Sequence, residues 1–244
     1  MVLGVIGISA ILAGVIQNIA GFGASIVMLL VLPRFFDFII TPALNAAICM
    51  GMTVIMSIRY RKYIQIKKIW LPSLCFMISS VGIIWFVKDI EMHVLGVAFG
   101  ILLILLSVYF VFFPQTFYFK PSPAMAIAFG LFAGFLSGLF AIGATVMALY
   151  FLSVSEDRNS YMGNLQPLLA VNNTIATVAR ITRGIYTTNL ILPTLIGFFG
   201  ILIGQKLGSR IAGKMNAKKL TTFIYFIIGI TGVETLIKQL SFIA

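Results

Sequence analysis

The stretch GFGAS, from Gly21 to Ser25, interrupts an apolar run, and AIGAT, from Ala141 to Thr145, interrupts a second apolar run 120 residues later. The two runs cover residues 3–32 and 124–152. A break in a helix at membrane depth is tolerated only where the backbone is buried in protein or lines a cavity. The repeated break therefore predicts a membrane protein whose two halves each begin with a glycine-broken or re-entrant helix.

The composition agrees with a membrane protein, because 61% of the 244 residues are hydrophobic and only 9% are charged. Most of the apolar runs are close to the ~20 residues that a helix needs to cross the hydrocarbon core of a bilayer. We expect an all-α polytopic protein in a cell membrane. The remaining apolar runs are 39–58, 69–87, 92–113, 162–181, 190–213 and 219–240.

The eight runs divide into two four-segment repeats within one integral domain, residues 1–244. At a spacing of 121 residues, Arg59 corresponds to Arg180 and Lys62 to Arg183. The first repeat covers about 1–116 and the second about 124–244. The linker between them, about 114–123, contains three prolines, which interrupt helices.

The distribution of Lys and Arg predicts the topology. If all eight runs cross the membrane, the two sides receive 9 and 8 basic residues. If the two broken runs instead return to the side where they began, the sides receive 5 and 12, which restores the usual excess inside. Each half then crosses an odd number of times, so the halves become inverted repeats with both termini outside. Strongly tilted crossings or a dual-topology homodimer remain open alternatives.

A helix that restarts after a break directs free N–H groups and the positive end of its dipole at the break, which favours an anion. Two such ends from inverted halves would form an anion site near the middle of the membrane. The alternative is close helix packing through small residues. The expected substrate contacts in the breaks are Gly21, Phe22, Gly23, Ala24, Ser25, Ala141, Ile142, Gly143, Ala144 and Thr145.

Polar side chains inside the apolar runs supply further candidates. We expect Asn18, Asn172 and Asn173 to line the same site, with Asn45 and Gln166 as weaker candidates. The alternative is that these amides only join helices, at ~0.6 kcal/mol each. Arg180 and Arg183 end the sixth run, where basic side chains usually extend to the membrane interface. A weaker expectation is that both residues attract the anionic substrate.

Several function classes are excluded by what the sequence lacks. Nearly all six acidic residues fall between apolar runs, so there is no evident proton relay or cation site. There is no phosphate-binding loop, metal-ligand spacing or nucleophile–base motif, so no enzyme, cofactor or metal is expected. The net charge of +11 lies in loops, where it indicates topology and contact with anionic lipid rather than nucleic acid. The expected partners are a small anionic substrate and membrane lipid.

The chain resembles the TauE/SafE family of sulfite exporters and toluenesulfonate-uptake permeases. The resemblance lies in GFGAS, in GLFAIGATVMALYFL (Gly138 to Leu152) and in GQKLGSRIAGKM (Gly204 to Met215). The chain departs from the family pattern at Ala141, Ala144 and Thr145, where the family usually has Gly, Gly and either Gly or Pro.

The resemblance implies movement of sulfite, a sulfonate or a related small organic anion across the bacterial inner membrane. The expected function is therefore a secondary transporter that works by alternating access, and export is the expected direction. The alternatives are a passive anion channel of the same architecture and a non-transporting membrane subunit.

Overall fold

The computed structural model describes residues 1–112, 122–211 and 217–241, and all regular elements in these ranges are helices. In chain order they are α1 (Val2–Ala20), α2 (Ala24–Val31), η1 (Leu32–Arg34), α3 (Ile40–Arg59), η2 (Arg61–Tyr63), α4 (Ile66–Phe86), η3 (Val87–Asp89), α5 (Met92–Phe112), α6 (Pro123–Phe140), α7 (Gly143–Val154), α8 (Arg158–Thr182), η4 (Thr188–Leu190), α9 (Ile191–Ile211) and α10 (Ala217–Leu240).

The prediction of an all-α polytopic membrane protein is confirmed for the described residues. Six helices there are long and apolar enough to cross a membrane. The two broken runs each form a helix pair, α1 with α2 and α6 with α7. The predicted linker falls mostly outside the described residues, although its last residue, Pro123, is the first residue of α6.

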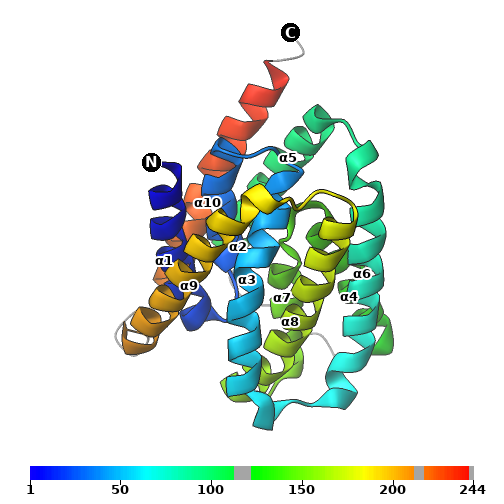
Figure 1. The fold of residues 1–244 in the computed structure, drawn as a ribbon. Coiled ribbons are helices and arrows are strands. Elements are labelled where there is room, and N and C mark those ends of the chain that lie inside the picture. The colour runs from blue at the N-terminus through cyan, green and yellow to red at the C-terminus, as the bar shows by residue number, and fades with distance from the viewer. Residues whose placement is uncertain (113–121, 212–216, 242–244) are drawn as a thin grey trace.

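The helices pair in a pattern that is unchanged when the two repeats are exchanged (Figure 1). α1 packs along α9, and their counterparts α6 and α4 pack along each other. The second members of the repeats, α3 and α8, form a central pair, and the fourth members, α5 and α10, form a peripheral one. Each broken helix therefore finds its main partner in the opposite repeat.

The direction of the helices can be followed by colour in Figure 1. α1 runs downward, and α2 folds back along it toward the end where α1 began. α3 runs downward whereas its counterpart α8 runs upward. The end of α10 lies on the same side as the N-terminus, and the ends of α3 and α9 lie on the opposite side. This arrangement is the one required by two re-entrant hairpins, and the inverted relation across the membrane stays a prediction.

Glycines bring the broken helices close to their partners. A Cβ built on Gly14 of α1 would collide with the carbonyl oxygen of Ile201 on α9, and one on Gly134 of α6 with that of Phe76 on α4. Gly14 and Gly134 are equivalent positions of the two repeats. For this pair the packing interpretation of the small residues holds, because both are needed for backbone contact between helices.

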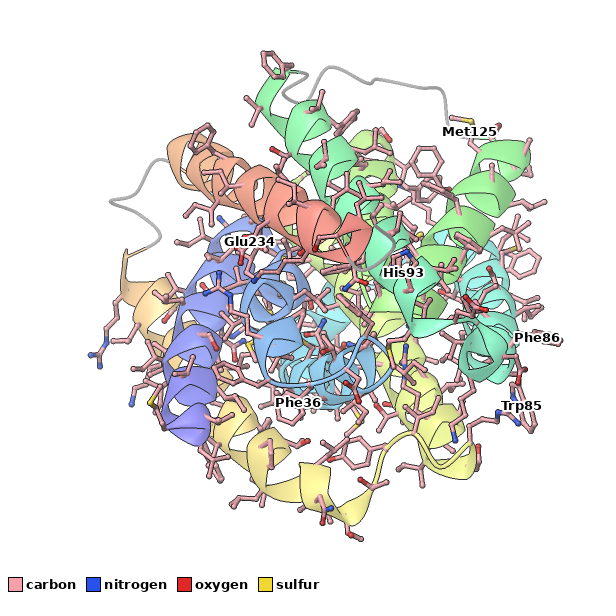
Figure 2. The ribbon with its side chains drawn as sticks, turned by 90° about the horizontal axis from the view of Figure 1, so that it is seen from above. Phe36, Trp85, Phe86, His93, Met125 and Glu234 are labelled. Carbon is pink, nitrogen blue, oxygen red and sulfur yellow. The ribbon has the colours of Figure 1, made fainter. Side chains whose placement is uncertain are left out.

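The periphery is apolar, whereas one central helix carries many polar residues. Seen from above, Trp85 and Phe86 point away from the helices at the rim, as lipid-facing side chains do (Figure 2). The central helix α8 is 25 residues long but too polar to count among the six apolar helices. It starts earlier than the apolar run at 162 because Asp157 caps its N-terminus, accepting a hydrogen bond from the Ser160 amide at 2.7 Å.

Candidate functional site

The first break is a left-handed turn between α1 and α2. Gly21 and Gly23 have φ angles of 84° and 104°, a conformation that costs little only for glycine. The turn closes when the Gly21 amide donates to the Gln17 carbonyl at 2.8 Å. The chain reverses within three residues, and α2 restarts at Ala24.

The second break also begins with a left-handed residue, but this residue is not a glycine. Ala141, at the position equivalent to Gly21, has a φ of 58° and is the one non-glycine residue with positive φ among the described residues. A left-handed conformation costs an ordinary residue roughly 1–2 kcal/mol. The structure holds Ala141 there because its amide donates to the Ser137 carbonyl at 2.9 Å.

The free amide groups expected at these helix starts are partly occupied within the protein. The Ala24 amide donates to Oε1 of Gln17 at 3.0 Å, and the Thr145 amide donates to the Ile142 carbonyl at 3.0 Å. The Gln17 side chain thus stands at the positive end of α2, in the place where a solute oxygen would bind. The Ala24 amide becomes available only when Gln17 moves.

A cavity of about 10 Å³ lies between the two breaks. Its volume is close to the minimum that holds one water molecule. Its walls come from both repeats. They are Gln17, Ser25, Cys49, Thr53, Phe76, Ser137, Ala141, Ala144, Leu169 and Asn173.

The lining residues are related by the repeat. In the broken helices, Gln17 of α1 and Ser137 of α6 are equivalent residues 120 apart. The central helix α3 contributes Cys49 and Thr53, and its counterpart α8 contributes Leu169 and Asn173. Equivalent helices of the two repeats therefore meet at the cavity.

The chemistry of the cavity is polar but uncharged. Amides, hydroxyls and one thiol line it together with four apolar residues, and no charged side chain is among them. Ser25 Oγ donates to Cys49 Sγ at 3.7 Å, and Thr53 Oγ1 donates to the Met50 carbonyl at 2.9 Å. Such groups can donate hydrogen bonds to an oxyanion. In the described part of the chain no group of three His, Cys, Asp or Glu side chains could hold a metal ion.

Helix α8 binds the carbonyl end of α1 at the first break. Arg158 Nη2 donates to the carbonyls of Asn18 at 3.0 Å and Ile19 at 3.2 Å. Gln166 Nε2 donates to the Gly21 carbonyl at 2.7 Å. These bonds join the two repeats, since α8 belongs to the second and α1 to the first. They satisfy carbonyl groups that a helix end leaves without partners.

Helix α8 also binds the second break, through Arg180. The expectation that Arg180 extends to the interface is wrong, because the residue is only 1% exposed. Its Nη2 donates to the carbonyls of Ser137 at 3.1 Å and Gly138 at 3.0 Å. Arg180 forms none of the ion pairs found among the described residues. A buried positive charge therefore lies directly behind Ser137, a lining residue.

The predicted contacts are distributed unevenly around the cavity. Ser25, Ala141, Ala144 and Asn173 line it. The others lie behind the wall, in the breaks or elsewhere; they are Asn18, Gly21, Phe22, Gly23, Ala24, Ile142, Gly143, Thr145, Asn172 and Arg183. The role of every one of these residues as a substrate contact, whether it lines the cavity or not, stays a prediction.

Three of these residues have contacts that explain their positions. Asn172 Nδ2 donates to Ser137 Oγ at 3.0 Å and so supports the wall. Asn18 faces α9, since its Cβ lies 3.1 Å from a Cβ built on Gly208. The guanidinium of Arg183 lies 5.1 Å from the ring centre of Trp85, away from the lining residues.

Sequence reasoning missed several residues that matter. Gln17, Cys49, Thr53 and Ser137 line the cavity but were not among the candidates. The weak candidate Asn45 donates to the Ser25 carbonyl at 3.3 Å. The spacing of 120 was the available signal for the broken helices, because Gln17 and Ser137 are polar at equivalent positions.

A family model described as Sulfite exporter TauE/SafE matches residues 6–235 of the chain. The match covers both breaks and all ten lining residues, and it confirms the resemblance carried by the glycine motifs. Comparisons with curated proteins and with solved structures found no match.

Proposed function

Because the chain belongs to the TauE/SafE sulfite exporter family, we propose that it is a secondary transporter of a small oxyanion. Sulfite, a sulfonate or a related organic acid is the substrate class, and the bacterial inner membrane is the location. The multi-pass fold and a family of transporters rather than enzymes support this proposal.

The central cavity is the observation on which the proposal depends. It is bounded by both breaks and lined by equivalent helices of the two repeats. At about 10 Å³ it leaves no room for an oxyanion, so the walls must separate before a substrate binds. Separation of the walls on one side at a time is the step that alternating access requires, with inverted halves moving against each other. A permanently open channel would not have a centre this small.

The electrostatics favour an anion over a cation. The cavity has no carboxylate, and the charge of Arg180 is fixed behind Ser137. The positive ends of α2 and α7 point toward the breaks. Movement of Gln17 away from Ala24 would release an amide donor to the substrate, so that the solute replaces a side chain of the protein.

The test uses isosteric substitutions of the lining hydroxyl and amide, Thr53→Val and Asn173→Leu. The purified protein is reconstituted in vesicles, and flux of sulfite, small sulfonates and carboxylates is measured. Loss of a hydrogen bond to a charged solute should lower kcat/KM by about tenfold or more. Thr174→Val is the matched control, because Thr174 is exposed on α8 and its hydroxyl donates to the Ala170 carbonyl in the same way.

Saturation and counterflow would support the carrier mechanism, whereas single-channel currents would replace it with a channel. Unchanged flux in both lining variants would move the substrate away from this cavity. Absence of flux and of stabilisation by every anion tested would favour a non-transporting subunit.

A further inference from the structure

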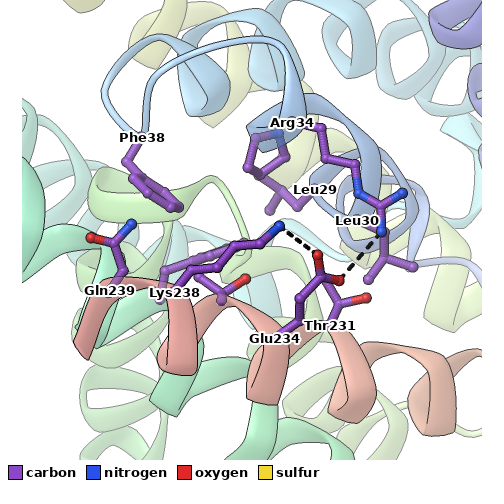
Figure 3. A pocket seen from close by; sticks show the side chains of 11 residues that line it. Leu29, Leu30, Arg34, Phe38, Thr231, Glu234, Lys238 and Gln239 are labelled. Atoms are coloured by element: carbon purple, nitrogen blue, oxygen red, sulfur yellow. Dashed lines mark hydrogen bonds and ion pairs between the residues drawn. The ribbon is translucent and has the colours of Figure 1, made fainter. Parts of the chain in front are cut away.

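A second and larger cavity opens at the end of the protein where α2 and α10 end (Figure 3). Its volume is about 580 Å³, within the range of small-ligand sites. Arg34 of η1 lines one side, and Thr231, Glu234 and Lys238 of α10 line the other. This end carries the N-terminus and the end of α10 in Figure 1, and the charge distribution predicts that it faces outward.

Two cations in this cavity share one carboxylate. Lys238 Nζ lies 2.7 Å from Oε1 of Glu234, and Arg34 Nη2 lies 3.5 Å from its Oε2. Figure 3 shows both cations directed at Glu234, Lys238 from the next turn of α10 and Arg34 from η1. The cations belong to different repeats, and the cluster keeps a net charge of +1. Two cations converging on one anionic group have the geometry of an oxyanion site, with the Glu234 carboxylate in the place of the solute.

The cluster is open to solvent, so a dissolved ion can compete with Glu234. The side chains of Arg34, Glu234 and Lys238 are 60%, 42% and 66% exposed. Ion pairs this exposed are weak. A competing oxyanion therefore needs little affinity to displace the carboxylate.

The wall of this cavity shares helix α2 with the central cavity and contacts the second break. Leu29 in its wall lies one helical turn beyond Ser25, which lines the centre. Phe99, also in its wall, packs against Phe140 with ring centres 5.2 Å apart. Phe140 directly precedes Ala141 of the second break. One turn of α2 and the Phe99–Phe140 pair thus separate the two cavities.

We propose that this outer cavity is a second oxyanion site, at the outer end of the transport path. Arg34 and Lys238 bind the anion, and Glu234 is a tethered competitor that keeps the affinity low enough for release. The assignment of a path rests on the proposed function, but the binding site does not. The same positive pair also draws anions to the surface before they bind.

The experiment measures sulfite binding separately from flux. Titration calorimetry is done in neutral detergent on the Thr53→Val/Asn173→Leu background, which weakens the central site. Removing Glu234 with Glu234→Gln should raise sulfite affinity about fivefold, and Arg34→Gln or Lys238→Gln should lower it about fivefold, as expected for one exposed charge contact. Lys67→Gln is the control. Lys67 is an exposed cation at the start of α4 and does not line this cavity.

Equal affinity in the Glu234→Gln, Arg34→Gln, Lys238→Gln and control variants would overturn the site. In vesicles, the Lys238→Gln variant should raise the KM for external sulfite at low salt and leave kcat unchanged, because only the approach to the centre is affected. If the variants show normal flux with unaltered KM and unaltered binding, the outer site is overturned and the proposed function stands. If binding depends on these charges but no flux is found, the proposed function is overturned and the outer site stands.

An anionic lipid headgroup has the same chemistry as a free oxyanion, so the lipid is varied as well. Binding is repeated in discs of zwitterionic lipid and in discs containing phosphatidylglycerol. Sulfite binding that persists in both supports a site for a dissolved anion. Sulfite binding abolished by phosphatidylglycerol would assign the site to lipid and overturn its place in the transport path.

Discussion

Substitution of Gly143, the first residue of α7, tests whether the second break must be tightly packed. A Cβ built there would lie 2.5 Å from Cε2 of Phe76 and would collide with the Ala133 carbonyl oxygen on α6. Since carbon atoms pack at 3.5–4.0 Å, α7 must move by about 1 Å. Both Phe76 and Ala144, the next residue of α7, line the central cavity, so this movement deforms it.

The stability change follows from two opposing terms. Overpacking costs about 1–3 kcal/mol, and the upper part of that range applies because one obstacle is backbone. Replacing glycine by alanine in a helix returns up to about 1 kcal/mol. The net loss for Gly143→Ala is about 1–2 kcal/mol, which corresponds to a Tm lower by roughly 2–8 °C in a chain of this size.

Gly82→Ala is the matched control, because a Cβ built on Gly82 of α4 meets nothing within 4 Å. This variant should keep its Tm or gain a few degrees, through the helix preference of alanine alone. The assay is thermal unfolding in detergent, followed by sulfite flux in vesicles. We expect Gly143→Ala to lose most flux while Gly82→Ala retains it. Equal Tm and equal flux in the two variants would refute the packing argument for the second break.

Three further predictions concern the supports of the site. Ala141→Gly should raise stability by up to about 1 kcal/mol, because relief of the left-handed conformation exceeds the added freedom of the unfolded chain, whereas Ala141→Val should lower it; a lower Tm for the glycine variant would contradict this. Arg180→Gln should cost about 2 kcal/mol, since two charge-assisted bonds are lost while the burial of a guanidinium is relieved, and chemical unfolding measures the difference. The amide of Ser160 holds the pKa of the capping Asp157 carboxyl below its usual value of 3.8. Its stabilisation is therefore present above that value and lost as pH falls below it, so Asp157→Asn should flatten the dependence of Tm on pH in the acid range.

The positions of the breaks and of the helices could be predicted from the sequence because they depend on local features. Glycine at Gly21 and Gly23 and the length of the apolar runs determine them without reference to the rest of the chain. The residues lining the cavity depend on helix rotation. Gln17 and Asn18 are neighbours, but successive residues of a helix point 100° apart. Which of the two meets α2 is decided by how α1 packs on α9.

The burial of Arg180 could not be predicted for a related reason. A basic residue at the end of an apolar run normally reaches the interface. Arg180 instead meets the Ser137 and Gly138 carbonyls, which are more than 40 residues away in sequence. Only the contact between α8 and the end of α6 provides these partners. The same applies to Arg158, whose acceptors on α1 are 139 and 140 residues away.

The pairing of α1 with α9 has a consequence for biogenesis. A ribosome reaches Ile191 roughly 10–35 s after it has made Ala20, at ordinary rates of synthesis. During this interval the first hairpin lacks α9, the helix against which Gly14 packs. A chaperone, a lipid or the insertion machinery must shield that face of α1 until the last quarter of the chain emerges, and a nascent chain arrested before α9 should be a preferred target of membrane proteases.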